Sequence, residues 1–291
     1  MVDFGRLVTA MITPMDANGK VDIGACVSVA KYLEQNGSTA ILLAGTTGES
    51  PVLSPEEKRE MFTSVKKSVN IPVMANIGTN STAASIANIR LAEECGVDGL
   101  LAVVPYYNKP NAASQFMHFS TLAEAATLPI IMYNVPGRTG INMTADTTIR
   151  LSKVKNIAGI KEASGNLEQL AEIVKGAADG FVVYTGEDCQ TLPTLAVGGY
   201  GVVSVASHVV GNEMADMIAS YLKGDIAHAK EMHLKLLEIN KRLFMTANPI
   251  PVKAAMNLLG FKAGFPRLPL APADETVLAA LTEEMKSLGK L

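Results

Sequence analysis

The chain has 291 residues, of which 48% are hydrophobic and 18% are charged, and its formal net charge is −3. This size allows one large buried core, and single α/β barrels commonly reach it. The 25 basic and 28 acidic residues are scattered, so the sequence has no basic stripe for nucleic acid. No stretch approaches the roughly 18 uncharged apolar residues of a membrane span, and the N-terminal residues lack a secretory signal pattern. We therefore expect a cytoplasmic protein.

Short apolar runs recur along the chain, with helical patterns between them. Near-continuous apolar strands separated by helices are typical of parallel sheets that are covered on both faces. Eight runs have this character, at residues 7–13, 40–44, 73–77, 99–104, 129–134, 157–161, 181–185 and 202–205. Eight strand–helix units predict a closed (β/α)8 TIM barrel, and a doubly wound sheet is the alternative.

The alternation stops near residue 224. Residues 225–245, 249–259 and 274–288 have helical patterns, and a proline-rich segment at 265–269 joins the last two. No low-complexity linker separates them from the preceding part. We expect a catalytic barrel over residues 1–224 and a C-terminal helical extension over residues 225–291, packed on the barrel.

The run at 157–160 ends abruptly in Lys161, at the carboxyl end of a predicted buried strand. Active sites of α/β barrels lie at this end of the strands. An amine walled by apolar neighbours is disfavoured as an ammonium ion and can act as a nucleophile that forms a Schiff base with a carbonyl. The ordinary alternative is a lysine that extends to solvent or pairs with Glu162.

Other strand ends carry polar groups. The segment GTTGES at 45–50 combines hydroxyls with free backbone N–H groups, which suits binding of a carboxylate, although it is also an ordinary turn composition. The adjacent Tyr106 and Tyr107 indicate either an interface or a site. Residues 186–188 are expected to cap the helix after the seventh strand.

The fifth predicted strand ends in Tyr133, a phenol that could move a proton, and Arg138 follows on a glycine-flanked loop with a planar guanidinium suited to a second carboxylate. Each could equally be a structural residue. Together with Lys161 they describe a site that condenses or cleaves a 2-oxo acid through an imine. Three distant cysteines and four scattered histidines match no disulfide or zinc pattern, so we expect neither a metal nor a cofactor.

Four motifs carry a resemblance to a known family. They are GTTGES at 45–50, YYNKP at 106–110, YNVPGRTG at 133–140 and GIKEASGN at 159–166. In this order and spacing they resemble the dihydrodipicolinate synthase family, (β/α)8 barrels with C-terminal helices that are related to N-acetylneuraminate lyase and other pyruvate-dependent aldolases. The resemblance covers the whole chain.

The resemblance implies a role for each matching residue. Lys161 would form the Schiff base with pyruvate, and Tyr133 would be the general acid and base. Thr46 and Tyr107 would complete a hydroxyl relay, in which the neighbouring subunit lends the tyrosine. The substrate-binding positions that the resemblance implies are Thr47 and Val203 for pyruvate and Arg138 for the carboxylate of aspartate semialdehyde.

The expected activity is therefore condensation of pyruvate with aspartate semialdehyde, at the entry to lysine and diaminopimelate synthesis. Arg138 favours this over cleavage of a sialic acid or a 2-keto-3-deoxy sugar acid. A catalytically silent barrel that binds a 2-oxo acid is an alternative from another class. The resemblance also implies a homodimer or a dimer of dimers. Ala84, Pro55 and Lys58 replace residues that bind lysine in feedback-inhibited members, so we expect weak or absent inhibition by lysine.

Overall fold

The structure is a computed structural model that describes residues 2–291. Its eight strands are parallel and close into a barrel in chain order, because β1 pairs with both β2 and β8. The strands are β1 (Leu7–Ala10), β2 (Ala40–Leu43), β3 (Val73–Asn76), β4 (Gly99–Val103), β5 (Ile130–Asn134), β6 (Ile157–Glu162), β7 (Val182–Thr185) and β8 (Gly201–Ser204). The barrel is confirmed, and the doubly wound sheet is excluded.

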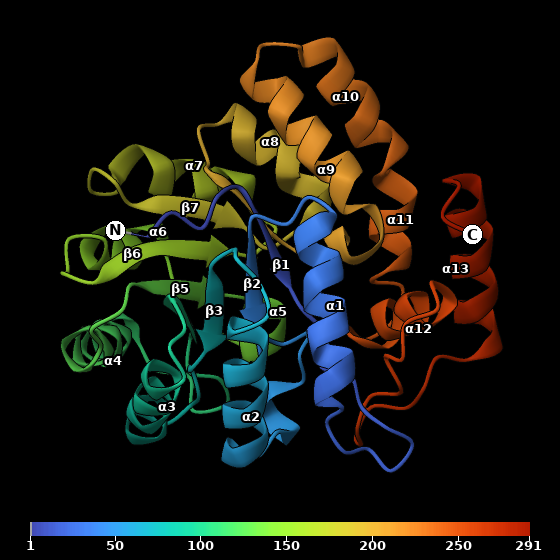
Figure 1. Ribbon diagram of the computed structural model, residues 1–291. Coiled ribbons are helices and arrows are strands. Elements are labelled where there is room, and N and C mark those ends of the chain that lie inside the picture. The colour runs from blue at the N-terminus through green and yellow to red at the C-terminus, as the bar shows by residue number, and fades with distance from the viewer. Residues whose placement is uncertain (1) are drawn as a thin grey trace.

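Helices surround the barrel (Figure 1). They are α1 (Ile23–Gln35), α2 (Pro55–Lys66), α3 (Thr82–Glu94), α4 (Ala112–Ala125), α5 (Pro136–Thr139), α6 (Ala145–Leu151), α7 (Leu167–Gly176), α8 (Thr191–Ala196) and α9 (Ser207–Leu222), with the 3-10 turns η1 (Ser50–Val52) and η2 (Asp188–Gln190). The start of α2 shows how the sequence determines where a helix begins. Ser54 and Glu57 form a reciprocal capping box, and Pro55 occupies the first turn.

Strand side chains are buried on both faces. One apolar cluster fills the barrel and includes Val8, Leu42, Met74, Leu101 and Ile131. A larger cluster lies between the outer face of the strands and the helices. Because both faces are covered, the strands read as continuous apolar runs with no polar alternation.

The C-terminal helices α10 (Ile226–Lys235), α11 (Leu237–Arg242), α12 (Ile250–Leu258) and α13 (Glu275–Ser287) follow α9 and lie along one side of the barrel (Figure 1). The single helix predicted over 225–245 is wrong, because it divides at Leu236. No sequence pattern marks this break, because Leu236 has its side chain in the core, 1% exposed, and so continues the apolar pattern.

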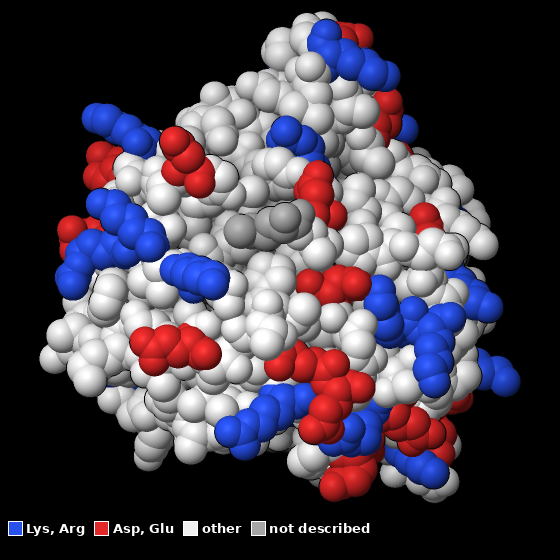
Figure 2. Space-filling model, turned by 60° about the vertical axis from the view of Figure 1, so that its left-hand side comes forward, with Lys and Arg blue, Asp and Glu red and all other residues white. Residues whose placement is uncertain are grey.

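The surface carries charges of both signs. Figure 2 shows lysine and arginine interspersed with aspartate and glutamate over the face in view. No helix within residues 2–291 has both the length and the apolar character needed to cross a membrane.

Candidate active site

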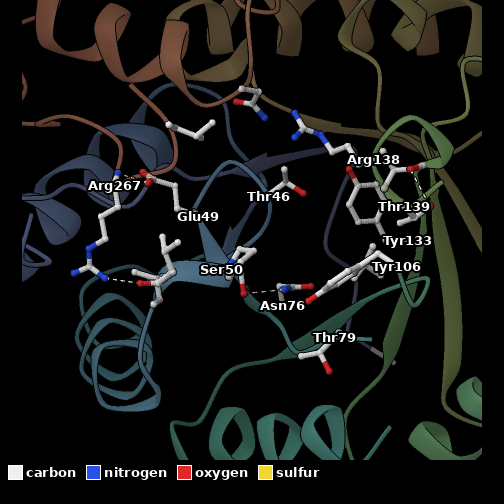
Figure 3. Close-up of a pocket in the computed structure, with 18 of the residues that line it drawn as sticks. Thr46, Glu49, Ser50, Asn76, Thr79, Tyr106, Tyr133, Arg138, Thr139 and Arg267 are labelled. Carbon is white, nitrogen blue, oxygen red and sulfur yellow. Dashed lines mark hydrogen bonds between the residues drawn. The ribbon is translucent and has the colours of Figure 1, made fainter. Parts of the chain in front are cut away.

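A cavity of about 520 Å³ opens at the carboxyl ends of the strands, the end of a parallel barrel where active sites lie. Figure 3 shows Thr46, Tyr133 and Arg138 on one side of this cavity and Glu49 with Arg267 on the other. The polar residues that line it include Thr46, Glu49, Ser50, Lys58, Asn76, Thr79, Tyr106, Tyr133, Arg138, Thr139, Asn248 and Arg267. Three residues predicted from the sequence, Thr46, Tyr133 and Arg138, are thus brought to one place.

Lys161 lies near the end of β6 and is only 6% exposed. Its Nζ is 4.5 Å from the centroid of the Tyr133 ring, in the neighbouring strand β5. It does not extend to solvent, and no ion pair joins it to Glu162 within residues 2–291. Both ordinary interpretations of this lysine are therefore excluded by the geometry.

The Glu162 carboxylate, 2% exposed, faces a different set of partners. It accepts hydrogen bonds from the side-chain amides of Asn134 and Gln169 and from the backbone N–H of Ser164, at 2.7 to 3.2 Å. A buried carboxylate is tolerated when several N–H groups satisfy it. Glu162 thus fastens the end of β6 to β5 and α7, next to Lys161.

Gly186, directly after β7, leaves room for the lysine side chain. A Cβ at this position would lie 2.7 Å from Cε of Lys161 and 2.6 Å from Cβ of Ala163. Such distances are too short for carbon atoms in contact. Only a glycine allows Lys161 to keep its observed position.

The GTTGES loop places Thr46 in the cavity wall and Thr47 behind it. Thr47 is 2% exposed, and its hydroxyl accepts a hydrogen bond from Nδ2 of Asn248 at 2.9 Å. Glu49 adopts the left-handed region with φ of 58°, which is costly for a residue with a side chain. Strain of this kind persists only where surrounding contacts hold it, and Glu49 is ion-paired to Lys253 at 2.8 Å.

Residues 186–188 do not cap a helix as expected. Glu187 precedes η2 without a side-chain capping bond. The Oδ2 atom of Asp188 instead accepts the backbone N–H groups of Val205 and Ala206 at 3.1 and 2.9 Å, just past β8. The cap prediction is wrong because the Asp188 carboxylate bonds to the chain just past β8, a long-range contact that local spacing does not reveal.

Burial raises the pKa of Glu187, as does the neighbouring Asp188. Lys161 and Arg138 act in the opposite direction, since a positive charge favours the carboxylate. Arg138 itself is exposed on α5 and aims its charge at the cavity. Two positively charged side chains, Lys161 and Arg138, therefore act on the carboxylate of Glu187.

Tyr107 stands apart from the other predicted residues. Its side chain is 89% exposed and its backbone is left-handed, with φ of 73°. Within the described chain, no hydrogen bond links the hydroxyls of Thr46, Tyr107 and Tyr133.

Val203, also predicted as a site residue, is buried in β8 and paired with Val8 of β1. One chain thus brings together Lys161, Tyr133 and Thr46, and leaves Tyr107 outside.

Sequence reasoning missed Asn248, Lys253 and Arg267. All three come from the C-terminal extension, far along the chain from the loop that they contact. A buried Lys or Arg is rare without a partner, but only the fold shows which carboxylate pairs with it. Among residues 2–291, no group of three histidine, cysteine, aspartate or glutamate side chains could hold a metal ion.

A closed parallel barrel with a cavity at the carboxyl ends of its strands, lined in part by hydroxyl and charged side chains, belongs to the class of (β/α)8-barrel enzymes. The chain is a member of the dihydrodipicolinate synthetase family, whose family model matches residues 3–288. The 4-hydroxy-tetrahydrodipicolinate synthase of Moorella thermoacetica is 50% identical over 292 residues, which cover 100% of both chains.

Solved structures show the same similarity. Dihydrodipicolinate synthase from Bacillus anthracis superposes with a TM-score of 0.96 at 45% identity, covering 99% of each chain. The enzyme from Cyanidioschyzon merolae with lysine bound superposes with a TM-score of 0.97, again at 45% identity and 99% coverage of each chain. These relatives agree with the family that the four motifs indicated.

Replacement of Gly186 by alanine tests the packing around Lys161. The added methyl group displaces the amine, so imine formation with a 2-oxo acid should slow by about a hundredfold, as expected for a misplaced reacting group. Gly137→Ala is the matched control, because a Cβ there meets nothing within 4 Å. The measurement is the rate of borohydride-trapped adduct by mass spectrometry. Equal rates for the two variants would contradict the steric role of Gly186.

Proposed function

We propose that this protein condenses pyruvate with L-aspartate 4-semialdehyde to give 4-hydroxy-tetrahydrodipicolinate, the first committed step of lysine and diaminopimelate synthesis. The observation that carries the proposal is the buried Lys161 at the end of β6, beside the Tyr133 ring. A binding protein would gain nothing from burying an amine without a carboxylate partner, because desolvation of the charged form costs free energy. Full-length relatives with this activity in their names support the assignment.

The chemistry follows from the placement of the groups. The Lys161 amine adds to the ketone carbon of pyruvate and water leaves, giving an imine. The imine acidifies the methyl group, which loses a proton to become an enamine, and the enamine carbon then attacks the aldehyde. We assign the proton transfers to Tyr133. The amino group of the semialdehyde finally attacks the imine carbon, which closes the ring and releases Lys161.

The two substrates carry carboxylates, and the site offers a separate place for each. We assign the pyruvate carboxylate to the Thr47 hydroxyl and to the backbone at Val203. Arg138 holds the carboxylate of the semialdehyde through its planar guanidinium. The positive charges of Lys161 and Arg138 that act on Glu187 are consistent with two anionic substrates.

We further propose a homodimer, or a dimer of dimers, in which each subunit lends Tyr107 to its neighbour. The exposed position of Tyr107 supports this, since a relay tyrosine 89% exposed on its own chain needs a second surface to be shielded from water.

We regard residues 1–224 as the catalytic barrel and 225–291 as an extension packed on it. Action on water-soluble metabolites suits a cytoplasmic enzyme.

The direct test is a substrate panel. Purified protein should consume pyruvate rapidly with aspartate semialdehyde and should not cleave N-acetylneuraminate or 2-keto-3-deoxygluconate. Lys161→Ala should abolish both turnover and the borohydride-trapped pyruvate adduct. Cleavage of a sugar acid would replace the biosynthetic assignment, and a trapped adduct without any turnover would indicate a silent binding barrel.

Substitution of Tyr107 by phenylalanine separates proton relay from imine formation. Loss of the hydroxyl should lower turnover by about 10²-fold, in the range of general acid–base contributions. The pyruvate imine should form nearly as fast as in the parent protein, because Tyr107 does not contact Lys161. Steady-state rates and adduct trapping measure the two effects. A turnover number that stays unchanged removes Tyr107 from the relay.

Lysine should inhibit the reaction weakly or not at all. Lys58, half-buried in α2, lines the cavity. Its ammonium has no ion pair within residues 2–291, so it would repel the cationic side chain of lysine. The relative from Cyanidioschyzon merolae, whose structure has lysine bound, is the comparison protein for lysine binding. Initial rates over a lysine titration are the readout, and half-inhibition at submillimolar lysine would contradict the prediction.

A further inference from the structure

The GTTGES loop is held by the C-terminal extension at two of its residues. Asn248, in the turn before α12, donates from Nδ2 to the Thr47 hydroxyl at 2.9 Å. Lys253 of α12 pairs with Oε1 of Glu49 at 2.8 Å, and the backbone N–H of Arg267 donates to Oε2 of Glu49 at 2.8 Å. The extension therefore reaches into the barrel mouth through specific polar contacts, beyond its apolar packing.

The contact with Thr47 determines what that hydroxyl can still do. A threonine hydroxyl has one proton to donate and two lone pairs that accept. Asn248 occupies a lone pair, and within the described chain no other hydrogen bond involves the Thr47 side chain. Thr47 and Asn248 are 2% and 6% exposed, so solvent has little access to either. The hydroxyl proton therefore has no acceptor among residues 2–291.

Within residues 2–291, the side-chain amide of Asn248 forms no other hydrogen bond that would explain its position. Its Oδ1 atom is buried and has no hydrogen-bond partner within residues 2–291. A buried acceptor without a partner is costly, so Asn248 is poorly explained as a residue that only stabilises the fold. Asn248 also lines the cavity into which Thr46, Tyr133 and Arg138 project.

We propose that Asn248 is a positioning residue that fixes Thr47 as a hydrogen-bond donor to the carboxylate of the 2-oxo acid. The proposal rests on the function proposed above and deepens it, because it makes the C-terminal extension part of the pyruvate site. An N–H donor at this position forces the Thr47 proton outward to the ligand. An acceptor in its place would draw that proton to itself and leave the carboxylate without a donor.

Asn248→Asp makes that exchange with almost no change of shape, and Asn248→Ala removes the partner. A structural role predicts the alanine variant to be worse, whereas our proposal predicts the aspartate variant to be worse. The concentration of pyruvate that gives half-maximal trapped imine should rise by about tenfold or more in Asn248→Asp, the value of one charge-assisted hydrogen bond. Asn257→Asp is the matched control, since the side chain of Asn257 in α12 forms its hydrogen bonds within residues 2–291 to the backbone of Ala263 and Gly264, both in the extension.

A double-mutant cycle with Thr47→Val shows whether Asn248 acts through Thr47. Once the hydroxyl is absent, replacing Asn248 by aspartate or by alanine should weaken pyruvate binding much less than it does in the parent. Additive effects, or an alanine variant that binds pyruvate more weakly than the aspartate variant, would overturn the proposal. If the parent protein itself traps no pyruvate imine, the proposed function fails first, so the two failures are distinguishable.

Discussion

Closure of the barrel is the constraint on which the site depends. Eight parallel strands leave no edge only when β1 pairs with β8, and this pairing satisfies the backbone hydrogen bonds of every strand. Because all strands run the same way, their carboxyl ends meet at one mouth. Residues separated by more than a hundred positions, such as Thr46 and Lys161, therefore converge without any direct contact between their segments.

The end of β6 must also hold its register, since a slip by one residue would turn Lys161 to the other face of the strand. Two features oppose such a slip. The carboxylate of Glu162 is fixed by Asn134, Gln169 and Ser164 on the outer face, and the inner face has room for the lysine only beside Gly186. Glu162 and Lys161, which are adjacent in β6, thus point to opposite faces of the strand. Glu162 anchors the strand, and Lys161 carries the amine.

The sequence predicted the barrel well, because strands covered on both faces leave continuous apolar runs and the eight predicted runs match β1 to β8 within a few residues. It also placed Lys161 and Tyr133 at strand ends, but it put Arg138 on a loop after β5, where the structure has the short helix α5. It could not reveal the break at Leu236, where the apolar pattern continues, or the use of Asp188 at the end of β8. Contacts such as Asn248 with Thr47 span 201 positions, and nothing in local spacing marks either partner.

The ion pair of Glu49 with Lys253 shows why the extension and the loop belong to one unit. Both side chains are almost wholly buried, 3% and 1% exposed, so each charge would be expensive without the other. Burial lowers the pKa of Lys253, and the Glu49 carboxylate works against that shift. Removal of the extension would leave a buried carboxylate and a left-handed backbone at Glu49 without support. The hydroxyl of Thr47, two residues away, would then lose its hydrogen-bond partner Asn248, so the GTTGES loop depends on the extension for its observed conformation.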